Sequence, residues 1–163
     1  MESAEILVLQ ASYTNPVHAE AICLVLNHYA EDPMGGGHSL PAGRLQQVPG
    51  ELAKRPYAFS VLAFVGGEPA GLVNCFEGFS TFACRPLVNV HNVAVVSKFR
   101  GLGLSQKMLH KVEDIARQRG CCKITLEVLE GNAVAQGAYG KFGFSPGMFD
   151  PAHGRMLFWI KAL

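Results

Sequence analysis

The sequence of 163 residues has no excess of charge of either sign, with 14 Lys and Arg against 13 Asp and Glu and a formal net charge of +1. Its basic residues form no run, so the sequence offers no positive patch for nucleic acid or for an anionic membrane surface. No apolar stretch reaches the roughly 18 residues that a membrane-spanning helix needs. We therefore expect neither a nucleic-acid partner nor a membrane partner.

The cysteines also lack a pattern. There are five, an odd number, and Cys121 and Cys122 are adjacent rather than spaced as a CxxC pair, which excludes the usual zinc motifs and a disulfide framework. The first residues include Glu2 and Glu5 and no basic region, so we expect no secretory signal peptide. The simplest interpretation is a cytoplasmic protein with reduced thiols and no metal.

The sequence does contain a regular succession of strand and helix patterns. Apolar residues make up 49% of the chain and charged residues 17%, which predicts one folded domain over residues 1–163. The order βααβββαβαβ predicts an α/β fold with a mixed sheet. Strands are predicted over residues 5–10, 57–65, 70–79, 87–96, 123–130 and 154–163, with a further short strand near Phe144. Helices are predicted over residues 15–31, 41–54 and 104–119, and the segment 132–144 is predicted to be a short helix beginning at Asn132.

Two local features give further detail on the predicted helices and strands. Pro49 falls inside the second predicted helix and predicts a break there or two short pieces. The run "LVNVHNVAVV" at residues 87–96 is apolar enough to be a strand buried on both faces.

The string "RGLGLS" at residues 100–105 joins that strand to the third helix. Glycines at such a junction serve a plain turn, or they leave backbone N–H groups at the positive end of a helix free to bind an anion. A dinucleotide fingerprint requires a third glycine where this sequence has Gln106, and a nucleotide P-loop requires a GK[ST] string that is absent. The turn alone does not name its anion.

A longer set of motifs resembles the GNAT superfamily of N-acetyltransferases. "RGLGLS" resembles the family's R/Q-x-x-G-x-G/A loop, with Ser105 in place of Gly or Ala, and "VAVVSKFR" resembles its V-x-P-x-x-R lead-in, with Ser97 in place of Pro. The segment "NAVAQGAYGKFGF" resembles N-x-x-A-x-x-x-Y-x-x-x-G-F at every fixed position: Asn132, Ala135, Tyr139, Gly143 and Phe144. The chain is identified as a small, bacterial-type, single-domain member.

The resemblance implies a central, mostly antiparallel sheet with splayed central strands and flanking helices. It also implies acetyl-CoA as co-substrate, with the pyrophosphate of coenzyme A on the glycine turn and the pantetheine arm along the preceding strand. The cofactor-binding residues would be Val93, Ala94, Val95, Arg100, Gly101, Leu102, Gly103, Leu104, Ser105, Asn132, Ala135 and Tyr139. Many small members pair through edge strands, so a homodimer is one expected state.

The implied reaction is direct attack of a primary amine, from a small molecule or a protein, on acetyl-CoA in a ternary complex. Such transfer requires removal of a proton from the ammonium, stabilisation of an oxyanion and protonation of the leaving thiolate. By resemblance, Tyr139 protonates the thiolate and a backbone N–H near Val95 meets the oxyanion. Asn132 and Tyr139 lie about two helical turns apart and should share one helix face.

Three residues are candidates for the general base. Histidine is a residue type suited to general base catalysis, and a period of two would place His91 on the face of Val93 and Val95. Glu127 and Glu77 are the alternatives, acting directly or through ordered water. For each candidate a structural role, in the core or in an ion pair, is the competing interpretation.

The acceptor side is less defined. Phe76, Phe79 and Phe82 and the glycine-rich loop over residues 31–40, a candidate mobile lid, would border it by resemblance. The leading alternative function is a non-catalytic acyl-CoA-binding or regulatory module on the same fold. Asn89, which stands where relatives place a base, and Ser105 are its best support.

Overall fold

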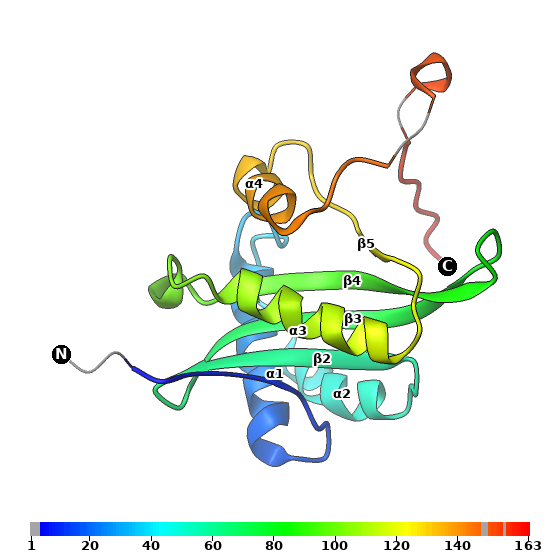
Figure 1. Cartoon of the computed structure of the whole chain (residues 1–163). Coiled ribbons are helices and arrows are strands. Elements are labelled where there is room, and N and C mark those ends of the chain that lie inside the picture. The colour runs from blue at the N-terminus through cyan, green and yellow to red at the C-terminus, as the bar shows by residue number, and fades with distance from the viewer. Residues whose placement is uncertain (1–3, 148–149, 155) are drawn as a thin grey trace.

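The core of the protein is a mixed five-stranded sheet with strand order β1-β2-β3-β4-β5 (Figure 1). The computed structural model describes residues 4–147, 150–154 and 156–163. The first three pairings are antiparallel and the last, between β4 and β5, is parallel, which confirms the predicted mostly antiparallel sheet. The strands are β1 (Ile6–Gln10), β2 (Ala58–Val65), β3 (Glu68–Ser80), β4 (Arg85–Val95) and β5 (Ile124–Leu126).

Helices cover both faces of this sheet (Figure 1). Apolar residues of α3 form one buried cluster with β2, β3 and β4, and residues of α1 form a second cluster with the opposite face. The helices are α1 (Pro16–Glu31), α2 (Ala42–Ala53), α3 (Leu104–Gln118) and α4 (Ala133–Phe142), with short 3-10 turns at Ser97–Phe99 and Pro151–His153. None of the helices in the described ranges is long and apolar enough to cross a membrane.

The starts of α1 and α4 follow directly from the sequence. The Asn15 side chain accepts a hydrogen bond of 2.9 Å from the Val17 N–H, and Pro16 takes the first helical position. Asn132 caps α4 in the same way, by accepting from the Ala135 N–H at 3.1 Å. Both predicted helix starts are confirmed.

The predicted break at Pro49 is wrong, because α2 is one continuous helix. Proline lacks the N–H that would bond to the carbonyl four residues earlier, which is that of Leu45. The Cys23 thiol of α1 donates to this carbonyl at 3.4 Å. Packing against α1 therefore satisfies the acceptor that proline leaves open, and the helix continues.

Four strand predictions also need correction. β5 spans three residues rather than 123–130, and no strand is described near Phe144 or over residues 156–163. A strand persists only where a neighbour pairs with it, and no strand in the described part of the chain pairs with the outer edge of β5. β2, not β4, is the strand buried at every position, since β4 leaves residues such as His91 exposed.

The glycine-rich loop after α1 is tied back onto that helix. The Gly35 N–H donates to the Asp32 carbonyl at 2.8 Å, and the Leu40 N–H donates to the Asn27 side chain at 2.9 Å. A Cβ built at Gly35 would lie 1.9 Å from the carbonyl oxygen of Tyr29, which is backbone of α1. Only glycine fits this approach.

We predict that Gly35→Ala lowers the free energy of unfolding by about 1–3 kcal/mol, because backbone must move to admit the methyl group. Gly50→Ala is the matched control: Gly50 lies inside α2 with open space around it, and alanine there should add roughly 0.5–1 kcal/mol. Urea denaturation measures both. Equal stability of Gly35→Ala and the unaltered protein would contradict the close approach.

Candidate functional site

The parallel pairing of β4 and β5 ends after three residue pairs. Val88 pairs with Ile124, Asn89 with Thr125 and Val90 with Leu126, and beyond Val90 the two strands separate. The edge of β4 over residues 91–95 therefore has no partner strand in the described part of the chain. This confirms the splayed central strands that the family resemblance implies.

A β-bulge at His91 marks the point of separation. Asn74 of β3 pairs with Asn92 and Cys75 pairs with Val90, so His91 is the extra residue. The His91 ring makes an edge contact with Phe76, with centroids 5.5 Å apart.

The bulge also overturns one expectation about β4. Val93 and Val95 pack against the cluster formed with α3, together with Val88 and Val90. His91 instead contacts Phe76, whose register partner is Asn89, on the opposite face. The prediction that His91 shares a face with Val93 and Val95 is wrong, because the extra residue interrupts the period of two.

A chain of polar side chains, buried at its centre, reaches the bulge from the α1 face. The Tyr13 hydroxyl lies 2.9 Å from Ser60 Oγ, Ser60 donates to Asn74 Oδ1 at 2.6 Å, and Asn74 Nδ2 donates to Asn92 Oδ1 at 3.1 Å. Ser60 and Asn74 are the buried polar residues of the described core. Sequence reasoning missed this chain, because its members come from three strands and one loop and form no local motif.

The glycine turn leaves the start of α3 open. Gly101 and Gly103 have φ of 84° and 69°, values that favour glycine, and a Cβ at either would meet nothing within 4 Å. No side chain caps the helix, and backbone N–H groups of residues 101–105 have no recorded acceptor among the described residues. These donors, at the positive end of α3, suit an anion.

Two contacts join this turn to α1. Arg100 Nη2 lies 3.1 Å from Asp32 Oδ2, and the Met34 N–H and then Arg100 hold the pKa of the Asp32 carboxyl below its ordinary value. The Ser97 N–H donates to His28 Nε2 at 3.2 Å, which places any single ring proton of His28 on Nδ1. A proline at position 97 could not make this bond.

The turn, the open edge of β4 and α4 surround one cavity of about 460 Å³, which we call the main cleft. It brings together eleven of the twelve predicted cofactor-binding residues; Leu102 lies outside the lining and is exposed. Sequence reasoning missed the residues that α1 and its loop contribute: His28, Tyr29, Asp32 and Met34. The glycine-rich loop was the only signal for them.

A smaller cavity of about 120 Å³, the side cavity, adjoins the main cleft. His91 and Glu127 line the side cavity. The residues common to both cavities are Tyr29, Met34, Val93, Asn132, Ala135 and Tyr139. Tyr139 and Val93 therefore stand where the two spaces meet.

Tyr139 is a partly buried phenol in contact with Phe144, with ring centroids 5.9 Å apart. Burial raises the pKa of Tyr139 above its ordinary value, and neighbouring Tyr29 adds to the shift. The hydroxyl therefore stays protonated at neutral pH. It can donate a proton or a hydrogen bond at the junction of the cavities.

The structure separates the two candidate glutamates. Asn89 Nδ2 donates to Glu127 at 3.3 Å and to Thr125 Oγ1 at 3.1 Å, so the amide orients the Glu127 carboxylate beside the side cavity. Glu77 lies 3.0 Å from Arg119 and lines neither cavity. His91 and Glu127 are brought together with Tyr139, and Glu77 is not.

The three predicted phenylalanines, two in β3 and one in the turn after it, also differ in where they lie. Phe76 contacts His91 and lies 6.4 Å from the Tyr57 ring between centroids. Phe79 and Phe82 are exposed towards the tip of the β3–β4 hairpin. Only Phe76 of the three predicted phenylalanines therefore contacts a residue that lines the side cavity.

The comparisons with known proteins all point to the same family. The model of the Acetyltransferase (GNAT) family matches residues 25–144. A putative [ribosomal protein bS18]-alanine N-acetyltransferase of Bacillus subtilis (strain 168) is 27% identical over 97 residues, which are 60% of each chain. A thialysine N-epsilon-acetyltransferase of Caenorhabditis elegans is 26% identical over 125 residues, which are 76% of this chain and 75% of the relative.

Solved structures match over nearly the whole chain. A probable acetyltransferase has a TM-score of 0.78 at 18% identity, covering 96% of this chain and 99% of that one. An aminoglycoside N-acetyltransferase in complex with CoA has a TM-score of 0.77 at 17% identity, covering 99% and 98%. At these identities the likeness shows a shared fold.

Proposed function

This chain belongs to the Acetyltransferase (GNAT) family, and from that premise we propose that it transfers the acetyl group of acetyl-CoA to a primary amine. One observation carries the proposal: the main cleft begins at uncapped N–H groups, follows an unpaired strand edge and ends at a protonated tyrosine beside a second cavity. Relatives named for alanine, thialysine and aminoglycoside acetylation support an amine acceptor.

At one end of the main cleft, the chain binds the anionic part of the co-substrate. Gly101, Gly103, Leu104, Ser105 and Arg100 line the cleft, and the backbone N–H groups of the first four and the guanidinium of Arg100 can hold a pyrophosphate. Asp32 already pairs with Arg100, so it orients the guanidinium and limits its net positive charge. The free edge of β4 from Val93 to Val95 can hydrogen-bond an extended amide chain.

At the other end, acetyl-CoA supplies an activated thioester, and side chains at the junction manage the protons. The backbone N–H near Val95 would stabilise the oxyanion, and the Tyr139 hydroxyl would give its proton to the departing sulfur. Because burial raises the pKa of Tyr139, that proton is present throughout the neutral range.

The side cavity is the proposed acceptor site. The Glu127 carboxylate, held by Asn89, attracts an ammonium group and can take its proton directly or through water, while His91 stands beside it as the alternative base. Asn89 thus positions the base although it cannot itself accept the proton. Glu77, paired with Arg119, is the least favoured of the three candidates.

The alternative, a non-catalytic acyl-CoA-binding module, is less well supported. Such a module needs the main cleft alone, whereas this chain also places a protonated phenol, a carboxylate and an imidazole around an adjoining cavity. Ser105 lines the main cleft, where its small side chain leaves the turn open.

Three broader features belong to the same proposal. We propose one domain over residues 1–163, a homodimer and a cytoplasmic location. Five free cysteines suit a reducing compartment, and burial raises the pKa of the Cys75 thiol, which keeps it protonated and unreactive.

Tyr139→Phe should lower kcat by about 10²–10⁴-fold and change acetyl-CoA affinity little, because only proton donation is lost. The assay is release of free thiol with a panel of amines: an alanine N-terminal peptide, thialysine and an aminoglycoside. In the unaltered enzyme kcat should also fall as pH rises above 10, through the raised pKa of Tyr139, and Tyr139→Phe should lack that fall. Tight acetyl-CoA binding without turnover on any amine would favour the non-catalytic alternative.

Glu127→Gln should remove the acidic limb of the pH profile of kcat/KM if Glu127 is the base, and Glu77→Gln is its matched control. Both changes replace one carboxylate by an amide, but only Glu127 lines the side cavity. Loss of the limb in His91→Ala instead would assign the role to His91. Loss in Glu77→Gln alone would contradict the placement of the acceptor.

A further inference from the structure

Asp32 is the only carboxylate that lines the main cleft within the described part of the chain. It stands beside the turn that can hold a pyrophosphate, and a fixed negative charge repels a bound anion. Its side chain is only 28% exposed, so water screens this charge in part. A carboxylate that opposes the ligand of its own cleft has another role to fill, and its two oxygens have different partners.

One oxygen, Oδ2, bonds to the glycine turn. Arg100 Nη2 lies 3.1 Å from it, and both residues line the main cleft. The two residues are 68 positions apart in the chain, so their ion pair joins the end of α1 to the turn before α3. The Met34 N–H and then Arg100 hold the pKa of Asp32 below its ordinary value, and the carboxylate is therefore charged at neutral pH.

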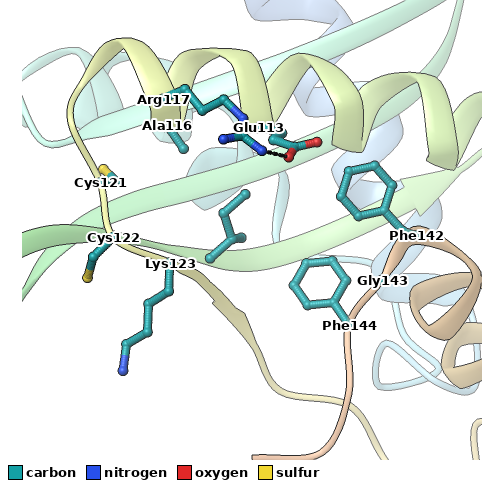
Figure 2. Close-up of a pocket in the computed structure, with 10 residues that line it drawn as sticks. Glu113, Ala116, Arg117, Cys121, Cys122, Lys123, Phe142, Gly143 and Phe144 are labelled. Atoms are coloured by element: carbon teal, nitrogen blue, oxygen red, sulfur yellow. Dashed lines mark hydrogen bonds and ion pairs between the residues drawn. The ribbon is translucent and has the colours of Figure 1, made fainter.

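A carboxylate of α3 forms a pair of a different kind. Glu113 lines a cavity of about 270 Å³ beside α3, β5 and the segment after α4, and it pairs with Arg117 at 2.5 Å (Figure 2). These two residues lie four positions apart on one helix, so their pair connects no separate elements. The pair of Asp32 and Arg100 connects two separate walls of one cleft.

The other oxygen of Asp32, Oδ1, accepts a hydrogen bond of 2.9 Å from the Met34 N–H. The Asp32 carbonyl accepts two more, from the N–H groups of Gly35 at 2.8 Å and Gly37 at 3.1 Å. Asp32 therefore organises the first half of the glycine-rich loop. Met34 lines both the main cleft and the side cavity, and since it is 45% exposed, packing alone does not fix its place.

We propose that Asp32 is a positioning residue that joins the co-substrate site to the acceptor site: through Oδ2 it restrains Arg100, and through Oδ1 it holds Met34 against the side cavity. This role rests on the proposed function, because it takes the side cavity as the acceptor site. Pyrophosphate and Asp32 compete for one guanidinium, so the carboxylate lowers the affinity for acetyl-CoA. In return, an ordered Met34 completes the wall where the two cavities meet.

Two substitutions separate the two roles of Asp32. Asp32→Asn removes the charge but keeps an oxygen that can accept from the Met34 N–H, whereas Asp32→Ala removes both. Glu113→Gln is the matched control, because it removes the charge of a carboxylate that also lines a cavity and also pairs with an arginine. Circular dichroism checks that all three variants fold.

Both Asp32 variants should bind acetyl-CoA about two- to fivefold more tightly than the unaltered protein in calorimetry at low salt, which is the scale of one partly exposed ion pair. The gain should shrink at high salt, because salt screens exposed charges. Glu113→Gln should leave the affinity unchanged. Unchanged or weaker binding in either Asp32 variant, or an equal gain in Glu113→Gln, would overturn the role of Oδ2.

The position of Met34 can be measured without turnover, from the NMR signal of its isotope-labelled methyl group, which Met34→Leu identifies. The rings of Tyr29 and Tyr139 line the same two cavities, so a fixed methyl group experiences their ring currents. The signal should stay in place in Asp32→Asn and move towards that of free methionine in Asp32→Ala. Equal spectra of the two variants would overturn the role of Oδ1.

With an amine that is acetylated, the KM for the amine should be about two- to tenfold higher in Asp32→Ala than in Asp32→Asn, which is the scale of one lost hydrogen bond. Equal KM values would overturn the link to the acceptor site. If no amine is acetylated while acetyl-CoA binding and the methyl signal change as stated, the proposed function is wrong, and the joining of the turn to the loop by Asp32 is supported.

Discussion

The parallel ladder between β4 and β5 stops after Val90, and the proposed site depends on that stop. A strand that loses its neighbour exposes backbone donors and acceptors, which must bond to water, to side chains or to a ligand. Here the exposed edge lies between the N-terminus of α3 and the helix α4, so it forms the wall of the main cleft. A continuous ladder would fill this space with β5 and remove the cleft.

Two linked features of β3 and β4 coincide with this point. The bulge at His91 changes the direction of the β4 side chains, and the buried chain from Tyr13 to Asn92 fixes that bulge within the core. A buried hydrogen-bond chain of this kind is costly to break, because each member would lose a partner away from water. The same feature gives β4 two chemical faces: valines pack towards α3, and His91 lines the side cavity.

Short sequence motifs predicted the parts of the site whose structure depends on neighbouring residues in the chain. Gly101 and Gly103 require positive φ, and Asn132 caps a helix, so each leaves a mark in a short motif. The partners from α1, such as Tyr29 and Asp32, lie about 70 residues or more away from the turn and α4, and no pattern along the chain connects them. The bulge was missed for the same reason: its register is set by β3, not by the strand's own alternation.

The sequence predicted the fold class and the order of the elements. It was least reliable for the strands at the end of the chain, where a strand forms only if another strand is available to pair with it. The patterns for β1 to β4 place each strand beside its neighbour in the chain, so periodicity was enough. Residues 123–130 and 154–163 have equally good strand patterns, but only three residues of the first pair and the described part of the second does not. An alternating pattern shows that a segment can form a strand, but the strand forms only where a neighbouring strand is available to pair with it.

The central claim is that the glycine turn at the head of the splayed strands binds the pyrophosphate of acetyl-CoA, and a calorimetric titration of two variants tests it. Gly103→Val and Gly67→Val introduce the same side chain at positive φ, with open space around both glycines, but Gly67 lies in the β2–β3 turn away from the main cleft. We predict that Gly103→Val weakens acetyl-CoA binding at least tenfold, about 1.4 kcal/mol, while Gly67→Val stays within about twofold of the unaltered protein. Equal affinity of the two variants for acetyl-CoA would contradict it.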